Sequence, residues 1–512
     1  MQCLNRLFLL FCFGALFVTS VVAEEASPWL RVEVEVEFGE DFGQNLGTLF
    51  EVYDQEGNLL AGAGYVGAYN SYVRNDRERL HFFLKSNQPG QTVEPMPRAN
   101  EMTGVYLSDL RGNLYARGRA AEDEHFYQWK PTENRWQVDE AKTEYDFHVA
   151  DKVFHVGLKE ITYDGETILD GTGQNIYFGE KYYAEGHLFL KTYGEPRTIE
   201  SNTLLAIPWS PSQPDLKLDL QQAIRFPLRS DKEFVYSFGQ LNGDVIAATN
   251  TGGVYRFRNG AWDVLLEPDM KTSFQIYAIM NYYDRLLMGQ YPTGELYEYD
   301  GEEFVLHENW PPVLSGVSPS AREAQSLMIY GGDLYVGVWP WAEVWRYDQN
   351  QKDWFFVKRM FNHPELTDTI VHPYETETQE VADMYNLWGQ RVTSLITMDD
   401  RLYISTSSKS GFAYQSIFGF LSGEQLLDYG RVYQLRQPGQ LTFPTNWSPG
   451  PQKFTFEVKG QTMRLFKEGE QVASQELPEG FVTEQAPHHI EWGKGVFGKL
   501  TGKLIQQHSN FE

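Results

Sequence analysis

The segment from Tyr330, YGGDLYVGVWPWAEVWRYDQNQKDWFFV, contains one complete copy of a repeated unit. A glycine turn precedes an apolar strand, a second strand ends in Tyr347–Asp348, and a polar turn leads to Trp354. Three other stretches follow this order: LNGDVIAATNTGGVYRFRNGAWDVL from Leu241, YDRLLMGQYPTGELYEYDGEEFVL from Tyr283, and MDDRLYISTS from Met398 with VYQL from Val432. Repeats of short strands with such turns predict the blades of a β-propeller.

The spacing of the repeats supports this fold class. Turn residues at equivalent places are 41, 48 and 68 positions apart, and these residues are Asp244, Arg285, Asp333 and Arg401. Blades of about four strands have periods near 40 to 50 residues, roughly as found here. Weaker units begin at Leu49, Val105 and Val153. We therefore expect an all-β protein, a β-propeller of about seven blades within a range of six to eight.

The unit from Tyr330 also resembles a kelch repeat. The resemblance is carried by the Gly331–Gly332 pair and by Trp354, which follows Tyr347 by seven residues. In weaker form the pattern extends from Leu49 to Leu435. It implies a propeller scaffold of the kelch-like or wider superfamily and no functional family, because unrelated functions share this fold.

The two ends of the chain differ from the repeats. Residues 1–23 combine Arg6, the apolar run from Leu7 to Val18 and small residues before Glu24, which is typical of a signal peptide cleaved after Ala23. We expect residues 24–437 to form the propeller and residues 438–512 a β-rich extension. The extension either closes the ring or forms a small sandwich.

A cleaved signal predicts an exported protein, secreted or periplasmic, that is soluble after cleavage. Both cysteines, Cys3 and Cys12, lie within the signal. The net charge of −27 argues against nucleic acid as a partner, because such binding requires neutralisation of phosphates. No sequence motif for a cofactor or for a known metal site is present, so we expect no cofactor. Metal dependence and oligomeric state stay open.

The longest interruption of the repeats is the insertion from Phe361 to Gln390. It contains six acidic residues, and no lysine or arginine occurs before Arg391. Loops of this length in compact domains are often functional. If the protein is an enzyme, its candidate catalytic residues are His363, His372, Tyr374 and Arg391, as acid–base groups and as a partner for a carboxylate.

Aromatic residues make up 15% of the chain. Those in long loops are candidates for stacking on a sugar, and we select Trp339, Trp341, Trp388 and Tyr414. The leading hypothesis is an exported propeller that binds a ligand, a glycan or another small molecule, on one face of the ring. One alternative is a polysaccharide lyase or glycoside hydrolase. Another is a protein–protein scaffold of the cell envelope, and whether the protein is an enzyme stays open.

Overall fold

The computed structural model describes residues 28–37, 47–65, 68–70, 79–85, 91–110, 112–118, 125–140, 147–150, 152–184, 186–213, 215, 217–269, 275–382, 384–409, 411, 415–445, 450–481, 485–493 and 499–504. The expected signal peptide lies outside these residues. The described part forms nine antiparallel sheets, with very little helix. The prediction of an all-β propeller is confirmed.

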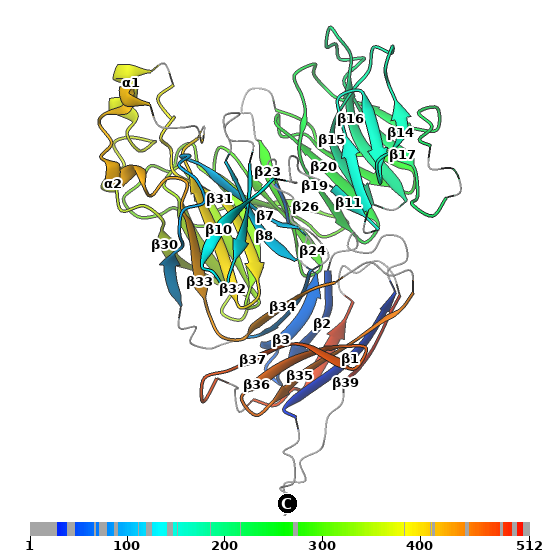
Figure 1. Cartoon of the computed structure of the whole chain (residues 1–512), viewed down its shortest axis with the longest axis vertical. Coiled ribbons are helices and arrows are strands. Elements are labelled where there is room, and N and C mark those ends of the chain that lie inside the picture. The colour runs from blue at the N-terminus through cyan, green and yellow to red at the C-terminus, as the bar shows by residue number, and fades with distance from the viewer. Residues whose placement is uncertain are drawn as a thin grey trace, which may run out of the picture.

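Seven of the sheets are propeller blades (Figure 1). Blade 1 comprises β7 (Val105–Leu110), β8 (Asn113–Gly118), β9 (Phe126–Lys130) and β10 (Arg135–Asp139). Blade 2 comprises β11 (Phe147–Val149), β12 (Lys152–Val156), β13 (Glu160–Tyr163) and β14 (Glu166–Asp170). Blade 3 comprises β15 (Tyr177–Ala184), β16 (His187–Tyr193), β17 (Thr203–Pro208) and β18 (Ile224–Pro227). Blades 4 and 5 comprise β19 (Val235–Leu241), β20 (Asp244–Thr249), β21 (Val254–Arg258) and β22 (Ala261–Leu266); and β23 (Ile276–Tyr282), β24 (Arg285–Gln290), β25 (Leu296–Tyr299) and β26 (Phe304–His307). Blades 6 and 7 comprise β27 (Glu323–Tyr330), β28 (Asp333–Trp339), β29 (Glu343–Asp348) and β30 (Asp353–Arg359); and β31 (Arg391–Met398), β32 (Arg401–Ser407), β33 (Val432–Arg436) and β6 (Thr92–Pro95).

The first strand of each blade is the innermost of its four strands, and in blade 5 the short strand β4 (Ala68–Asn70) pairs with the inner edge of β23. β19 contacts β23, β23 contacts β27, β27 contacts β31, and β31 contacts β7. The ring is closed within blade 7, where β6 from the N-terminal part of the chain pairs with β33. Connections between blades, and those between second and third strands, therefore share one face of the ring, here called the upper face.

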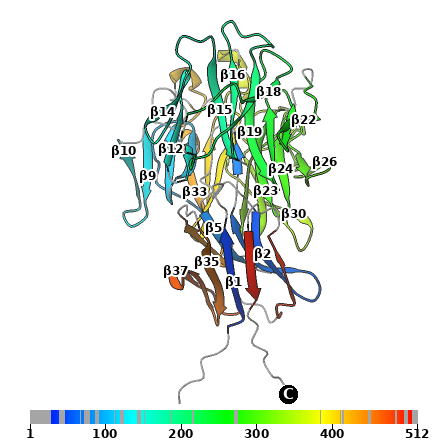
Figure 2. The ribbon, with the colours of Figure 1, turned by 90° about the vertical axis from the view of Figure 1, so that its right-hand side faces the viewer.

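The other two sheets form a β-sandwich below the ring (Figures 1 and 2). One sheet is ordered β37-β36-β35-β1-β39 and the other β34-β5-β3-β2-β38. Their strands are β1 (Leu30–Glu37), β2 (Gly47–Tyr53), β3 (Leu59–Tyr65), β5 (Arg79–Leu84), β34 (Gln440–Pro444), β35 (Gln452–Lys459), β36 (Thr462–Lys467), β37 (Glu470–Glu476), β38 (His489–Trp492) and β39 (Lys499–Leu504). Val32, Phe82 and Phe456 belong to a single apolar core between the sheets. The alternating strand from Leu30 buries its valines there, as its period of two requires.

Two details of the expected blade assignment are wrong. The unit from Leu49 is not a blade, because β2, β3 and β5 pair with C-terminal strands of the sandwich. The unit from Val153 covers parts of two blades, since β13 and β16 lie in different sheets. Alternation and glycine turns are common to blades and sandwiches, so they do not distinguish the two in single strands.

The sandwich is joined to the ring by pairing and by buried charges. β4 (Ala68–Asn70), from the connection between β3 and β5, pairs with the innermost strand β23 of blade 5. Beside the Gly331–Gly332 turn of blade 6, Lys85 forms a buried ion pair with Asp333. Arg79 of β5 pairs with Asp109 of blade 1, and both side chains are buried. The lower face is therefore covered at several blades, and the upper face is the one on which loops converge.

Candidate functional site

Two long loops over blades 6 and 7 build a projection on the upper face, here called the tower. It comprises residues 361–382 and 384–390, before β31, and residues 408–409, 411 and 415–431, between β32 and β33. Its helices are α1 (Glu375–Val381), η2 (Ser416–Phe418) and α2 (Gly423–Leu426). The Trp388 ring lies 5.1 Å from that of Phe418 and so joins the two loops. The insertion recognised in the sequence thus lies on the face where a ligand site is expected.

Inside the tower, His363 meets Tyr374. His363 Nδ1 lies 2.6 Å from the Tyr374 hydroxyl, and His363 Nε2 lies 3.4 Å from an Asp428 carboxylate oxygen. The donor and acceptor roles in the His363–Tyr374 bond depend on the histidine tautomer: with the proton on Nε2, which faces Asp428, Nδ1 accepts a hydrogen bond from the Tyr374 hydroxyl. Tyr374 is 6% exposed, and burial raises the pKa of its hydroxyl well above the usual value. These contacts stabilise the tower and give a substrate little access to the phenol.

His372 and Arg391 meet a different residue, Trp339. The His372 ring lies 4.8 Å from the Trp339 ring, and the Arg391 guanidinium lies 5.8 Å from it. Burial lowers the pKa of His372 to about 4, even though Glu375 lies 3.4 Å away and opposes this shift. Arg391 is buried beside Glu323 at 3.6 Å. The four predicted catalytic residues therefore form two sets of contacts, and His372 is neutral at pH 7.

The tryptophans selected for sugar stacking are in the core. Trp339 is 2% exposed, and Trp341 and Trp388 are fully buried. The Arg359 guanidinium covers the Trp341 ring at 5.0 Å. A sugar needs a free ring face, so the prediction that these three residues stack on a ligand is wrong. Burying such large apolar rings is more favourable than exposing them. Tyr414 lies outside the described residues.

A line of aromatic side chains, which includes the buried Trp339, crosses the upper ends of blades 4 to 6 and is here called the aromatic arc. Its members in order are Phe234, Tyr236, Tyr277, Tyr291, Trp339, His372 and Tyr385. Successive ring centroids lie 4.9, 4.5, 6.3, 4.8 and 5.4 Å apart, with Tyr277 and Tyr291 joined through Gln275 instead. The Tyr291 amide donates to the Gln275 carbonyl at 2.9 Å, and the Tyr277 hydroxyl donates to the Gln275 side chain.

Parts of this line are accessible. Tyr385 is 46% exposed, and Phe234, Tyr236 and Tyr291 are half-buried. Burial raises the pKa of Tyr291, with further contributions from Tyr385 and Glu323. The Tyr291 ring also lies 6.3 Å from the ring of Trp339 in blade 6. The arc is therefore a shallow aromatic surface with partly free rings.

Five innermost strands carry a β-bulge near their upper ends. The extra residues are Glu180, Tyr236, Tyr277, Gln325 and Thr393. Bulges are frequent next to active sites because they redirect a side chain. Two of these residues, Tyr236 and Tyr277, belong to the aromatic arc and stack on each other. The bulges thus place the extra side chains at the same level in neighbouring blades.

Buried amides accompany the arc. Gln325 is 2% exposed, and neither atom of its amide group has a hydrogen-bond partner among the described residues. Gln290 Oε1 is also unpaired within that part of the chain. Leaving such groups unpaired costs roughly 1–3 kcal/mol each, so an unpaired buried amide calls for a water or a ligand.

Sequence reasoning missed these residues, although a repeated signal marks four of them. An apolar residue, the bulge residue and a small residue open the first strand of blades 4 to 7, as Val-Tyr-Ser, Ile-Tyr-Ala, Ala-Gln-Ser and Val-Thr-Ser from residues 235, 276, 324 and 392. The middle position varies in chemistry while its neighbours stay apolar and small. The fixed neighbours pack between the strands, and at the variable position Thr393 is used in buried hydrogen bonds to the Val105 carbonyl and to Ser405.

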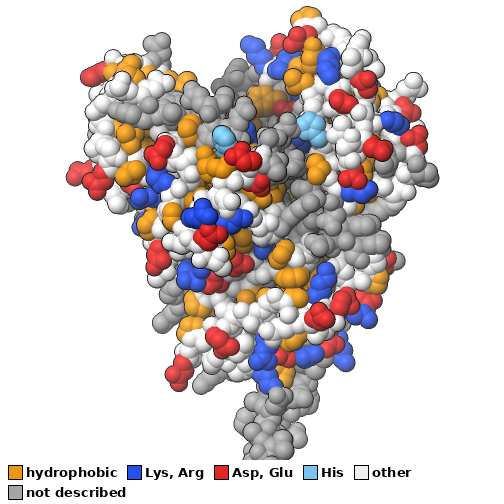
Figure 3. Space-filling view, viewed as in Figure 1, with side chains coloured by type: hydrophobic (Ala, Val, Ile, Leu, Met, Phe, Trp, Pro, Cys, Tyr) orange, Lys and Arg blue, Asp and Glu red, His pale blue; other side chains and the backbone are white. Residues whose placement is uncertain are grey.

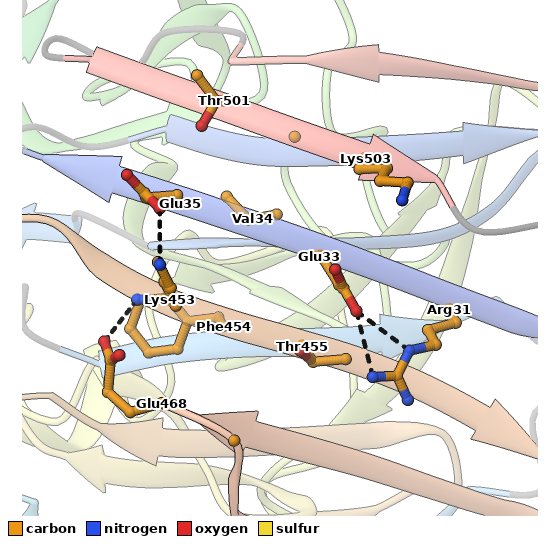
Figure 4. A pocket seen from close by; sticks show the side chains of 12 residues that line it. Arg31, Glu33, Val34, Glu35, Lys453, Phe454, Thr455, Glu468, Thr501 and Lys503 are labelled. Carbon is orange, nitrogen blue, oxygen red and sulfur yellow. Dashed lines mark hydrogen bonds and ion pairs between the residues drawn. The ribbon is translucent and has the colours of Figure 1, made fainter.

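A second hollow lies on the outer face of the sandwich (Figure 4). It has a volume of about 590 Å³ and crosses β1, β35 and β39. Arg31 pairs with Glu33 at 3.2 Å, and Lys453 pairs with Glu35 at 3.4 Å. These partly exposed charges satisfy one another, which is typical of a solvated sheet face. The hollow is a weaker candidate than the aromatic arc.

Two searches of the described residues gave no site. No group of three or more histidine, cysteine, aspartate or glutamate side chains there could hold a metal ion. No helix in the same part of the chain is long and apolar enough to cross a membrane.

No protein-family model matches the chain, and no curated protein matches it significantly. Similar solved structures include the computationally designed Ika8 protein, with 11% identity, a TM-score of 0.34, and coverage of 63% of this chain and 98% of that one. BBS1N, solved in complex with ARL6DN, has 13% identity, a TM-score of 0.36, and coverage of 69% and 98%. The N-terminal domain of Nup159 has 9% identity, a TM-score of 0.30, and coverage of 74% and 96%. Scores this low say nothing about function, and the propeller assignment rests on the sheets themselves.

Proposed function

We propose that the protein is an exported propeller that binds a carbohydrate on its upper face, along the aromatic arc. The observation that supports this proposal is the line of partly free tyrosine rings together with two buried amides, of which Gln325 has no hydrogen-bond partner and Gln290 has an unpaired oxygen among the described residues. Aromatic rings offer flat apolar surfaces to the C–H faces of a sugar. Gln290 and Gln325 supply the few fixed polar groups that orient a ligand in such sites. Hydroxyl groups of a sugar both donate and accept, as an unpaired amide requires.

The same contacts favour binding over catalysis. His363 and Tyr374 use their polar atoms on each other, and His372 is buried. A general base needs to reach the proton that it removes. The lyase or hydrolase alternative therefore has less support than binding, and His363, Tyr374, His372 and Arg391 become structural residues of the tower and blade 7 under this proposal.

A glycan array with the folded full chain tests the proposal, with Tyr236→Leu as the decisive variant. Leucine keeps apolar volume and removes the ring, so we expect binding of any glycan that scores on the wild-type protein to weaken roughly three- to tenfold, which corresponds to an aromatic contribution of about 1 kcal/mol. The matched control is Tyr127→Leu, a half-buried tyrosine on strand β9 of blade 1.

Tyr127→Leu is expected to bind as the wild type does. Circular dichroism on each variant confirms that it is folded. An array without any bound glycan, or equal losses in the two variants, would contradict the assignment of the arc to carbohydrate.

A second candidate function, protein recognition, is favoured by the outer surface of the tower. Five large apolar side chains are exposed there: Leu366, Met384, Tyr385, Ile417 and Leu427. The same two loops carry five exposed carboxylates that have no ion pair within the described part of the chain: Glu365, Asp368, Glu377, Glu380 and Glu424. Figure 3 shows hydrophobic and acidic side chains together over this upper left region. This combination fits a basic, amphipathic segment of a partner protein.

The probe for this second function is a cationic amphipathic helical peptide with lysine and leucine faces, measured by fluorescence anisotropy. We expect the affinity to fall with added salt, because the exposed carboxylates are screened, and Ile417→Asp to weaken binding about tenfold. Leu158→Asp is the control, since Leu158 is 64% exposed on blade 2. If the affinity for the peptide did not depend on salt, or if Ile417→Asp and Leu158→Asp weakened binding equally, the tower would not be the docking surface.

A further inference from the structure

Lys191, on the second strand of blade 3, is a buried cation that forms no ion pair with the described residues, although the charge of Glu180 acts on it. The residue is 2% exposed. Its ammonium group has no hydrogen bond and no ion pair to any of the described residues. Charged groups are costly to bury unless they are paired, and burial lowers the pKa of this lysine. An anion bound at Lys191 would remove that cost.

A second cation, Arg197, approaches the same aromatic ring. The Lys191 ammonium lies 4.4 Å from the Tyr193 ring centroid, and the Arg197 guanidinium lies 4.1 Å from it. Arg197 is exposed and also has no ion pair within the described part of the chain. Two cations at one ring repel each other, so this arrangement favours a negative charge between or beside them.

A neighbouring cation, Lys159, has the hydrogen-bond partners that Lys191 lacks. Lys159 lies 3.6 Å from the ring of Tyr177, which stacks on Tyr193 at 5.3 Å. Its ammonium donates hydrogen bonds to two backbone carbonyls, at 2.6 and 2.8 Å. Lys159 is therefore held by the protein itself, whereas the two cations on Tyr193 are left for a ligand.

The nearest acid does not neutralise the pair. Glu180 is the bulge residue opposite Lys191, and its backbone has a φ of 22°, a strained value for a residue other than glycine. No ion pair joins Glu180 to either cation, and its buried Oε2 atom has no hydrogen-bond partner among the described residues. Burial raises the pKa of Glu180, and the two cations oppose this shift. Strain and an unpaired oxygen at a bulge are typical of a binding site.

We propose that Lys191 and Arg197 bind the carboxylate of a small organic anion at the upper end of blade 3, with Glu180 beside it. The class is a carboxylate because Arg197 offers a planar fork that matches two oxygens. A phosphate dianion is disfavoured because Glu180 contributes negative charge at the same place.

The site adjoins the aromatic arc. Tyr182 of β15 stacks on Phe238 of β19 at 5.4 Å. Glu180 lies two residues before Tyr182, and Tyr236 lies two residues before Phe238; both Glu180 and Tyr236 are bulge residues. The two positions therefore face one another at one level of the ring. A sugar acid on the arc would place its carboxylate at Lys191, but the anion site stands on its own contacts and does not require the arc.

Isothermal titration of the full chain with sodium glucuronate, sodium acetate, glucose and inorganic phosphate tests the site. We expect glucuronate and acetate to bind, and Lys191→Met and Arg197→Gln each to weaken both at least tenfold. Lys152→Met is the matched control, because Lys152 also lies over a tyrosine ring but pairs with Asp164 at 3.1 Å. Its affinities are expected to stay at the wild-type value.

A second measurement separates a ligand site from a structural lysine. Without ligand, Lys191→Met is expected to melt at the wild-type temperature or above it, because the variant removes an unpaired buried charge. A lower melting temperature would show a structural lysine and overturn the proposal. The proposal would also be overturned if phosphate bound more tightly than glucuronate, or if Lys191→Met left the affinity for acetate unchanged. If acetate binds and no glycan scores on the array, the anion site is kept and the carbohydrate function is rejected. If a glycan scores on the array and acetate does not bind, only the anion site is rejected.

Discussion

Lys85→Met is expected to lower the free energy of unfolding by about 3–5 kcal/mol, the range measured when one partner of a buried ion pair is removed. Lys85 pairs with Asp333 and lies 3.7 Å from Asp348, while Arg346 contacts both aspartates at 2.8 and 3.6 Å. All four side chains are less than a tenth exposed. Without Lys85, two buried carboxylates share one arginine. Urea unfolding followed by tryptophan fluorescence measures the loss.

Two variants show that the loss comes from an unpaired charge. Lys453→Met removes an exposed pair with Glu35 and is expected to cost less than about 1 kcal/mol. Adding Asp333→Leu to Lys85→Met leaves Arg346 with Asp348 and is expected to restore part of the stability. Burial raises the pKa of Asp333 and Lys85 opposes this shift, so the effect of Lys85→Met should shrink at low pH, where Asp333 takes up a proton. If Lys85→Met unfolded at the same urea concentration as the wild type, the charge cluster would not join the sandwich to the ring.

The buried cluster illustrates which parts of the fold the sequence could predict. Asp333 and Tyr347 were placed correctly because turns and strand alternation depend on neighbours along the chain. Lys85 and Asp333 are 248 residues apart, and no local pattern relates them. The same limit explains the wrong blade at Leu49. Its strands have the alternation of a blade, but their partners are the C-terminal strands, and pairing over that distance is decided by packing of the whole chain.

The candidate site was predicted in part. The insertion from Phe361 was recognised by its length, and the structure places it on the upper face. The roles of Trp339, Trp341 and Trp388 were not predictable from residue type, because tryptophan serves equally in cores and at binding surfaces. Lys191 and Arg197 appear ordinary in a sequence of net charge −27, and only the burial of Lys191 and the Tyr193 ring that both cations approach distinguish them. The triplets that open the innermost strands were visible in the sequence, but their meaning depends on bulges that the structure reveals.

Acidification is expected to destabilise the protein through His81, by roughly 3 kcal/mol between pH 7 and pH 4. His81 lies on β5 in the middle of a sandwich sheet and is 6% exposed. Burial, with a smaller effect from Arg79, lowers its pKa from 6.5 to about 3. Above pH 6.5 neither the folded nor the unfolded state binds this proton. Below pH 6.5 only the unfolded state takes it up, so stability falls until the folded histidine also titrates near pH 3.

Comparing His81→Leu with the wild type isolates this contribution from the other titrating groups. We expect the variant to gain stability relative to the wild type as the pH falls, by about 3 kcal/mol between pH 7 and pH 4, because leucine binds no proton. His489→Gln is the control, because the His489 side chain is 45% exposed and lacks the burial on which the effect at His81 depends. Urea midpoints at pH 7, 5.5 and 4 give the three curves. Parallel curves for the wild type and His81→Leu would mean that water reaches His81 in the folded state, and the sandwich core at β5 would then be more open than its packing with β3 and β34 indicates.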